Sequence, residues 1–211
     1  MDFSELIRLV TEGDAGEAEA WTRRALQDGA EPGEILERGL IAAMDGVGRL
    51  YSAGEIYVPE MLVAARAMKR CLAVLQPLLT QGDHASRGKI VIGTVKGDIH
   101  DIGKNIVGIM LEGSGFEVVD LGVDVSPQAF AEAVVEHRPD IVGLSALLTT
   151  TMPVMRTVIS ALEEFGVRET VKVMVGGAPL TDEYAREIGA DAYASDAALA
   201  SARARELVSA V

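Results

Sequence analysis

The residue types best suited to chemistry gather in one short segment, TVKGDIHDIGKN, at residues 94–105. Within it, Asp98 and His100 are two residues apart, and Gly103 gives the backbone room before the next predicted helix. A carboxylate next to an imidazole can hold the ring in one orientation and raise the basicity of its other nitrogen, as it does for metal-bound histidines. The spacing therefore suits acid–base chemistry or a histidine that binds a metal.

The same segment is a poor match to nucleotide-binding loops. A Walker A loop has four residues between its glycines and ends in Gly-Lys followed by Ser or Thr. Here five residues separate Gly97 from Gly103, and Asn105 replaces the hydroxyl residue. Asp98 and Asp101 would also repel phosphates. The three spaced glycines of a dinucleotide-binding loop are absent as well.

The number of histidines and cysteines limits the metal chemistry. The chain has three histidines, His84, His100 and His137, and one cysteine, Cys71. One histidine cannot build a zinc site alone, and one cysteine excludes both an intrachain disulfide and a multi-cysteine zinc site. His100 could instead give one axial bond to a metal that arrives inside a macrocycle. Taken alone, a purely structural histidine is an equal alternative.

The part of the chain after residue 88 has the pattern of a parallel α/β domain. Continuous apolar runs occur at residues 89–95, 116–122, 140–147, 171–177 and 191–195. Predicted helices separate or follow them at about 102–114, 127–137, 152–165, 181–188 and 197–210. Strands buried on both faces give such runs because helices cover both sides of a parallel sheet. We expect a flavodoxin/Rossmann-like, doubly wound, five-stranded parallel sheet, with ligands at the carboxyl ends of the strands.

The first part of the chain follows a helical pattern instead. Four apolar-periodic segments occupy residues 1–81, and Gly13, Gly29 and Gly54 interrupt them. Helices of this length with short connections are typical of a four-helix bundle. Residues 82–88 are polar and without periodicity, which predicts a linker between this bundle and an α/β domain at 89–211.

Charge and hydropathy exclude some classes of partner. The net charge is −13, which disfavours binding to nucleic acid. No stretch reaches about 18 apolar residues, so no membrane span is expected. The segment MDFSELIRLV lacks the basic start and apolar run of a signal peptide. These features predict a soluble, cytoplasmic protein.

Three separated elements resemble the signature of cobalamin-binding domains. They are Asp98-Ile-His100-Asp-Ile-Gly103, Ser145-Ala-Leu147 and Gly176-Gly177, at the ends of predicted strands one, three and four. Such domains occur in methionine synthase, B12-dependent mutases and the corrinoid proteins of methyltransferase systems. Residues 39–70 also resemble the helical cap domain that precedes the cobalamin domain in methionine synthase and in corrinoid proteins.

The resemblance implies a cobalamin or related corrinoid bound base-off, with His100 as the lower cobalt ligand. Asp98 would hold His100, and Thr151 would complete this relay at a position where the methionine synthase pattern has serine. Ser145 and Thr149 would bond the nucleotide tail of the cofactor. Further contacts with the cofactor are implied for Gly97, Ile99, Asp101, Ile102, Gly103, Leu147, Gly176, Gly177, Tyr193 and Ala197.

The helical cap is expected to shield the upper face of the corrinoid. Tyr51 and Val58 match the positions of the usual Phe and Leu of the cap, and Met44 is a neighbour of these positions. A methionine or valine on a bundle helix is otherwise a common core residue, so the assignment depends on the resemblance.

Three functions are compatible with a corrinoid site. A methyl carrier needs only a cap and a cofactor domain, whereas a mutase also needs a substrate barrel of about 250 residues. A B12-binding sensor or regulator is the alternative, but the acidic N-terminal half shows no basic recognition helix. We therefore expect a carrier without catalytic activity of its own. Its partners would be a substrate-specific corrinoid methyltransferase, a second methyltransferase with a tetrahydrofolate or thiol acceptor, and a reductive activase.

Overall fold

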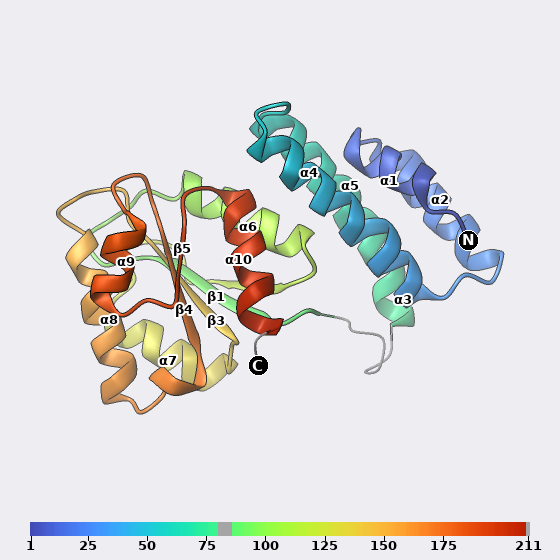
Figure 1. The fold of residues 1–211 in the computed structure, drawn as a ribbon. Helices are drawn as coiled ribbons and strands as arrows, with labels where there is room; N and C mark the ends of the chain where they lie inside the picture. The colour runs from blue at the N-terminus through green and yellow to red at the C-terminus, as the bar shows by residue number, and fades with distance from the viewer. Residues whose placement is uncertain (80–85, 210–211) are drawn as a thin grey trace. The chain divides into compact units, whose positions relative to one another are not determined.

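The computed structural model describes residues 1–79 and 86–209 (Figure 1). The chain divides into two compact units, one of Met1–Ser86 with Gly113–Gly115 and one of Arg87–Glu112 with Phe116–Val211. Most of the predicted linker at 82–88 lies outside the described residues. No helix within the two described ranges is long and apolar enough to cross a membrane.

The first unit is helical, and its helices begin and end at recognisable signals. The helices are α1 (Ser4–Thr11), α2 (Ala15–Gln27), α3 (Pro32–Glu34), the π-helix η1 (Ile35–Ile41), α4 (Ala42–Ser52), α5 (Val58–Leu75) and the 3-10 turn η2 (Gln76–Leu78). Asp14 caps α2 by accepting from the N–H of Glu17, and Gly13 and Gly29 follow α1 and α2 with positive φ. Since α3, η1 and α4 are continuous, the predicted helices are present, but the third contains a π-helical segment.

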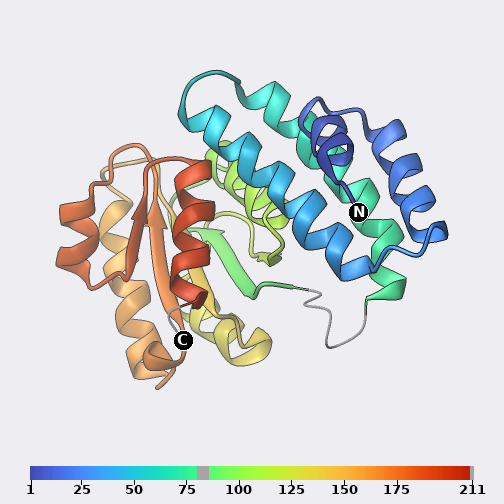
Figure 2. The same ribbon diagram turned by 45° about the vertical axis from the view of Figure 1, so that its right-hand side comes forward.

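These helices bury one apolar stripe each. α1 packs on α4 and α2 packs on α5 (Figure 2). α1 also lies close to η1, where a Cβ at Gly39 would stand 2.6 Å from Cδ2 of Leu6, so the leucine side chain would have to shift. The predicted stripe of the third helix is buried throughout, at Ile35, Leu36, Leu40, Ala43, Met44 and Val47.

The second unit is a five-stranded parallel sheet in the order β2-β1-β3-β4-β5. Its strands are β1 (Lys89–Thr94), β2 (Glu117–Asp120), β3 (Ile141–Ser145), β4 (Lys172–Gly176) and β5 (Ala192–Ala194). The helices are α6 (Ile102–Gly113), α7 (Pro127–His137), α8 (Met152–Glu164), the 3-10 turn η3 (Arg168–Thr170), α9 (Asp182–Ile188) and α10 (Ala197–Ser209). This strand order is the predicted flavodoxin-like one.

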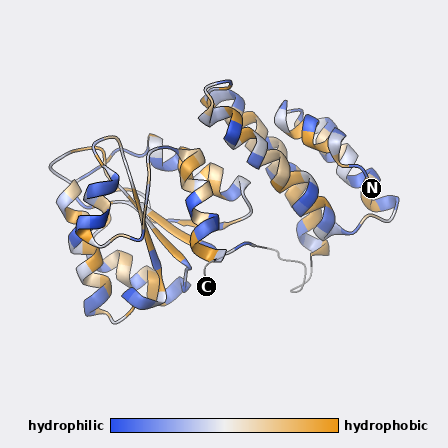
Figure 3. Ribbon diagram, in the orientation of Figure 1, coloured by the Kyte–Doolittle hydropathy of each residue, from blue (hydrophilic) through white to orange (hydrophobic). Residues whose placement is uncertain are grey.

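Helices cover both faces of this sheet, with α6 and α10 on one side and α7 and α8 on the other (Figure 1). Successive residues of a strand point to opposite faces, so β4 contributes Val173 and Val175 to one core and Met174 to the other. The strands are accordingly among the most hydrophobic parts of the chain (Figure 3). The double-sided burial explains why their sequences are continuous apolar runs rather than alternating ones.

Candidate functional site

Strand pairing brings the three signature elements to one edge of the sheet. In the register of the parallel ladders, Thr94 at the end of β1 pairs with Ser145 at the end of β3, and Ser145 pairs with Gly176 at the end of β4. The segments that follow these residues therefore emerge side by side. They leave the sheet at the carboxyl ends of its strands, which is where open α/β sheets hold their ligands.

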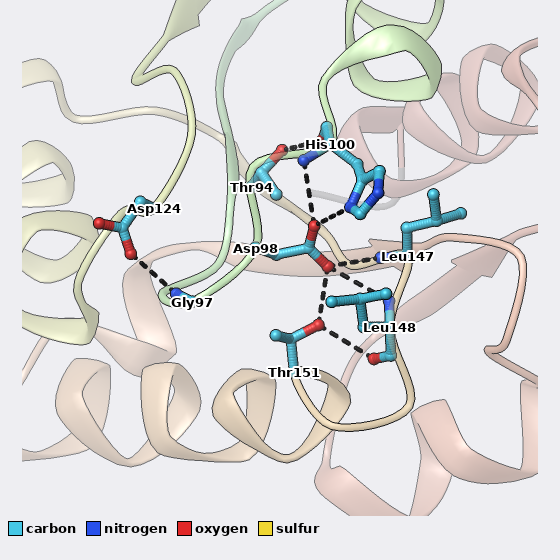
Figure 4. A network of polar contacts seen from close by, with 8 residues as sticks. All are labelled: Thr94, Gly97, Asp98, His100, Asp124, Leu147, Leu148 and Thr151. Atoms are coloured by element: carbon cyan, nitrogen blue, oxygen red, sulfur yellow. Dashed lines mark hydrogen bonds and ion pairs between the residues drawn. The ribbon is translucent and has the colours of Figure 1, made fainter.

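Asp98 is the centre of a polar network at this edge (Figure 4). Its carboxylate is buried, with the side chain 0% exposed. Oδ1 accepts from the backbone N–H of His100 at 3.1 Å, and Oδ2 accepts from the N–H groups of Leu147 at 2.8 Å and Leu148 at 3.2 Å. The hydroxyl of Thr151 donates to Oδ2 at 2.7 Å. One carboxylate thus ties the loop after β1 to the loop after β3.

Burial by itself raises the pKa of Asp98, but the hydrogen bonds oppose it. The donors are the Thr151 hydroxyl, the His100 ring and the backbone N–H groups of Leu147 and His100, and together they lower the pKa well below its usual value. Hydrogen bonds to the charged form of an acid favour that form. Asp98 is therefore ionised at neutral pH.

The same carboxylate fixes the ring of His100. Nδ1 lies 2.6 Å from Oδ1 of Asp98, and the side chain is 46% exposed. Because an ionised carboxylate can only accept, Nδ1 carries the proton, which leaves Nε2 as the nitrogen with a lone pair for a metal. The backbone of this residue is held too, since the Thr94 hydroxyl donates to the His100 carbonyl at 3.0 Å.

Thr151 occupies the N-cap position of α8 without capping the helix through its side chain. Its hydroxyl instead reaches Asp98, and it also lies 3.0 Å from the carbonyl oxygen of Leu148. A plain helix cap was the structural alternative for the Thr149–Thr151 run. The geometry agrees with the role of Thr151 that the resemblance implies.

Three large apolar side chains on or next to the two loops that Asp98 joins are exposed. Ile99 is 74% exposed, Ile102 76% and Leu147 44%. Large hydrophobic side chains exposed on such loops favour a binding site, because a ligand that covers them removes them from water. A single imidazole nitrogen beside an apolar surface suits a broad macrocycle that brings the equatorial ligands of its own metal. The residues present therefore fit a corrinoid.

The two glycines at the end of β4, Gly176 in the strand and Gly177 directly after it, are required by the protein's own backbone. Gly177 has φ +141°, and a Cβ there would lie 1.9 Å from the carbonyl oxygen of Ala146. A Cβ at Gly176 would lie 3.1 Å from the carbonyl oxygen of Ala194. Tyr193 is partly buried on β5, and Ala197 is buried at the start of α10. Bonds from these residues to a nucleotide tail stay a prediction.

The cap residues lie in the first unit, and their contact with the cofactor stays a prediction. Tyr51 is near the end of α4 and Val58 begins α5, and both are partly buried. Met44 is fully buried.

Sequence reasoning missed several residues that hold the loop. Leu148 acts through its backbone N–H, so its side chain gives no signal in the sequence. Asp124 accepts from the N–H of Gly97 at 2.8 Å (Figure 4). Lys104, with a side chain only 2% exposed, pairs with Asp120 and donates to Asn105 at 2.8 Å. The position of Lys104 directly after Gly103 of the signature is the feature of the sequence that could have pointed to this residue.

The Lys104–Asp120 pair gives an asymmetric stability prediction. Asp120→Ala leaves a buried ammonium with a poorer set of partners and is expected to cost about 2–3 kcal/mol of unfolding free energy. Lys104→Met removes the buried charge with its partner half-exposed, so about 1 kcal/mol or less is expected. Urea unfolding followed by circular dichroism measures both, with Asp120→Asn as the charge-only control. Equal costs for the two variants would contradict the burial argument.

Comparison with known proteins places the chain in a family. Models described as the B12 binding domain match residues 88–202 and, separately, residues 3–76. The first match alone spans more than half of the chain, so the chain belongs to the family of B12-binding proteins. The fold described above is the one expected for this class.

Within that class, the relatives are corrinoid proteins. "Dimethylamine corrinoid protein 1" of Methanosarcina acetivorans is 50% identical over 179 residues, which are 84% of each chain. "Trimethylamine corrinoid protein 2" of Methanosarcina mazei is 44% identical over 190 residues, covering 89% of this chain and 87% of the relative. The predictions of family, of corrinoid binding and of a corrinoid protein in a methyl-transfer system are confirmed.

Solved structures agree with this assignment. The methanol:cobalamin methyltransferase complex of Methanosarcina barkeri contains a chain with a TM-score of 0.86 and 28% identity, covering 100% of this chain and 82% of that one. A cobalamin-binding protein of Desulfitobacterium hafniense has a TM-score of 0.83 and 32% identity, with 98% of both chains covered. The predicted fold, a helical cap and a Rossmann-like sheet, is confirmed.

Proposed function

We propose that this chain binds a corrinoid base-off, with Nε2 of His100 as the lower axial ligand of the cobalt. The observation that carries the proposal is the contact between His100 Nδ1 and the ionised, fully buried Asp98. A carboxylate in this position fixes the tautomer and raises the ligand strength of the opposite nitrogen. The exposed apolar side chains of Ile99, Ile102 and Leu147 support a broad apolar ligand at the same place.

When bound, the corrinoid supplies a cobalt centre that accepts and releases a methyl group. The protein contributes an imidazole whose donor strength can change. While His100 binds the metal, Asp98 holds the proton on Nδ1. If Nε2 were to take a proton in place of the metal, the same carboxylate would stabilise the resulting imidazolium. Thr151 and the N–H groups of Leu147 and Leu148 keep the carboxylate ionised through this change.

The carrier role requires partners. The neighbour from Methanosarcina barkeri is part of a methyltransferase complex, which supports a corrinoid methyltransferase as a partner of this chain. The names of the relatives support a methylated amine as the source of the methyl group. A second methyltransferase and a reductive activase complete the proposed system, because a shuttle must be unloaded and rescued after accidental oxidation.

The test compares the wild type with His100→Gly after incubation with hydroxocobalamin or methylcobalamin and desalting. The wild type is expected to retain the cofactor at a ratio near one to one. His100→Gly is expected to retain it too, but with shifted absorption bands and a more positive cobalt(II)/cobalt(I) midpoint potential, because imidazole ligation stabilises cobalt(II).

His137→Gln is the matched control, since His137 ends α7 just before β3 begins and so lies at the opposite edge of the sheet. Its spectrum and potential should equal those of the wild type. A wild type that retains no corrinoid would contradict the site, and an unchanged spectrum in His100→Gly would contradict the ligand assignment.

A further inference from the structure

Asp124, in the segment between β2 and α7, contacts the His100 loop from the side opposite the β3 segment (Figure 4). Its Oδ1 accepts from the N–H of Gly97 at 2.8 Å, and its own N–H donates to the carbonyl oxygen of Asp98 at 3.0 Å. The two bonds hold the peptide groups on either side of the Gly97–Asp98 peptide, those that join Lys96 to Gly97 and Asp98 to Ile99. Lys96 adds an ion pair to Oδ2 at 3.1 Å.

The backbone of Asp124 is held in an uncommon conformation. Its φ is +56°, and among the residues that the structure describes only Arg138 shares a positive φ without being glycine. Non-glycine residues avoid this left-handed region, and Asp and Asn tolerate it best because their short polar side chains bond locally. Such strain persists where the surrounding structure enforces it, and it clusters at functional sites.

The neighbouring backbone enforces this conformation. The Thr94 N–H donates to the Gly122 carbonyl at 3.0 Å, and the Val125 N–H donates to the Thr94 carbonyl at 3.0 Å. These bonds, with the parallel bridge between Val95 and Val125, extend the β1 ladder past the end of β2. Asp124 is thereby fixed next to the turn at Gly97, whose own φ is +84°.

The hydrogen bond to Gly97 matters more here than the ion pair. The side chains of Lys96 and Asp124 are 58% and 46% exposed, and ion pairs at such exposure contribute little. The bond to Gly97, in contrast, joins a charged acceptor to the backbone one residue before Asp98, and charge-assisted bonds of this kind are strong.

We propose that Asp124 is a positioning residue for the metal ligand: by bonding the Gly97 N–H and the Asp98 carbonyl it sets the orientation of the Asp98 carboxylate, and through it the bond from His100 to cobalt. The inference rests on the proposed axial role of His100. Asp124 itself touches neither the imidazole nor the ligand in this scheme.

The experiment uses the full chain loaded with cobalamin and reduced to cobalt(II). Electron paramagnetic resonance detects the nitrogen hyperfine splitting of an axial imidazole, and redox titration gives the cobalt(II)/cobalt(I) midpoint potential. Asp124→Gly keeps the φ of this position without strain and removes the acceptor. It is expected to weaken imidazole ligation about fivefold, the effect of losing one hydrogen bond. The potential then rises by about 40 mV, since tenfold equals about 59 mV for one electron.

Two variants test whether the bond or the charge is responsible. Asp124→Asn keeps a neutral acceptor for the Gly97 N–H, so it should keep the nitrogen splitting and shift the potential by less than Asp124→Gly does. Lys96→Met removes the ion pair alone and should match the wild type. If Asp124→Gly folds poorly, Asp124→Ser, whose shorter side chain reaches Gly97 less well, is expected to show a smaller shift in the same direction.

The outcomes separate the two proposals. A wild-type potential in Asp124→Gly and Asp124→Ser, with the nitrogen splitting intact, would overturn the positioning role and leave His100 as the ligand. An Asp124→Asn variant that behaves like Asp124→Gly would also overturn it, because charge and not the Gly97 bond would then be responsible. A wild type without nitrogen splitting would instead refute the axial role of His100.

Discussion

Asp98→Ala is expected to lower the free energy of unfolding of the corrinoid-free protein by about 3–4 kcal/mol. This is a large effect for a single substitution in the loop after β1. The reason is the number of donors that lose their acceptor. The backbone N–H groups of Leu147 and Leu148 and the buried hydroxyl of Thr151 all donate to this carboxylate. A buried donor left without a partner costs its full desolvation penalty.

An isosteric replacement is not expected to rescue the loop. In Asp98→Asn, an NH2 group replaces one of the two oxygens. Both oxygens accept hydrogen bonds in the wild type, so in either orientation of the amide the NH2 group meets donors and not acceptors. The cost should stay above about 2 kcal/mol, the range for hydrogen bonds to charged groups. Asp101→Asn is the control for loss of one charge in the same loop, because Asp101 is exposed, and it should cost less than about 0.5 kcal/mol.

The pH dependence provides a second measurement of the same interaction. Because folding lowers the pKa of Asp98 below its usual value near 3.8, the ionised group stabilises the fold above that pH. This stabilisation is lost progressively as the pH falls below 3.8, since the unfolded chain then takes up a proton more readily. The loss should be of the order of 2 kcal/mol in the wild type and absent in Asp98→Asn.

Urea unfolding at a series of pH values measures both effects. Circular dichroism follows the whole chain, and the fluorescence of Trp21, the single tryptophan, follows the helical unit in which α2 lies. Variants at Asp98 should shift the transition seen by circular dichroism. An Asp98→Asn variant as stable as the wild type from about pH 3 to 7 would show that the carboxylate network does not support the fold.

Most of the fold follows from the sequence because its main determinants are local. Continuous apolar runs between amphipathic segments predict the β-α alternation, and observed bounds such as Pro127–His137 for α7 agree with the predicted ones. The π-helix at Ile35–Ile41 was not predictable, because a change from one helical hydrogen-bond pattern to another leaves the apolar stripe in place. Its glycine, Gly39, has meaning only once Leu6 packs against it.

The site was predictable where side-chain types carry the chemistry. Asp98 and His100 were singled out by their residue types and spacing, and Thr151 by the resemblance to cobalamin-binding domains; the structure joins the three by hydrogen bonds. Leu148 contributes only its backbone, and Asp124 adopts a positive φ without being glycine, so neither residue type reveals its role. Contacts made by the backbone depend on strand register, which a sequence specifies only through the whole sheet.

Among substitutions that add a single methyl group to the α/β unit, Gly177→Ala is expected to lower the stability most. The new Cβ would lie 1.9 Å from the carbonyl oxygen of Ala146 and 2.9 Å from its carbonyl carbon, and both belong to backbone that cannot rotate away. The φ of +141° adds strain of its own. Together, overpacking and strain should cost about 3–5 kcal/mol, a large part of the stability of a domain.

The position of Ala146 gives this variant a second effect. A movement of Ala146 that relieves the clash displaces the residue before Leu147, whose N–H donates to Asp98. Corrinoid retention should therefore fall together with stability, because the glycine after β4 sets the place of the donors that orient the His100 loop.

Gly189→Ala is the matched control: its φ is +82° and no atom lies within 4 Å of where the added methyl group would stand, so about 1 kcal/mol is expected from strain alone. Equal stability of the two variants would contradict the steric argument, and unchanged corrinoid retention in Gly177→Ala would contradict the link to Asp98.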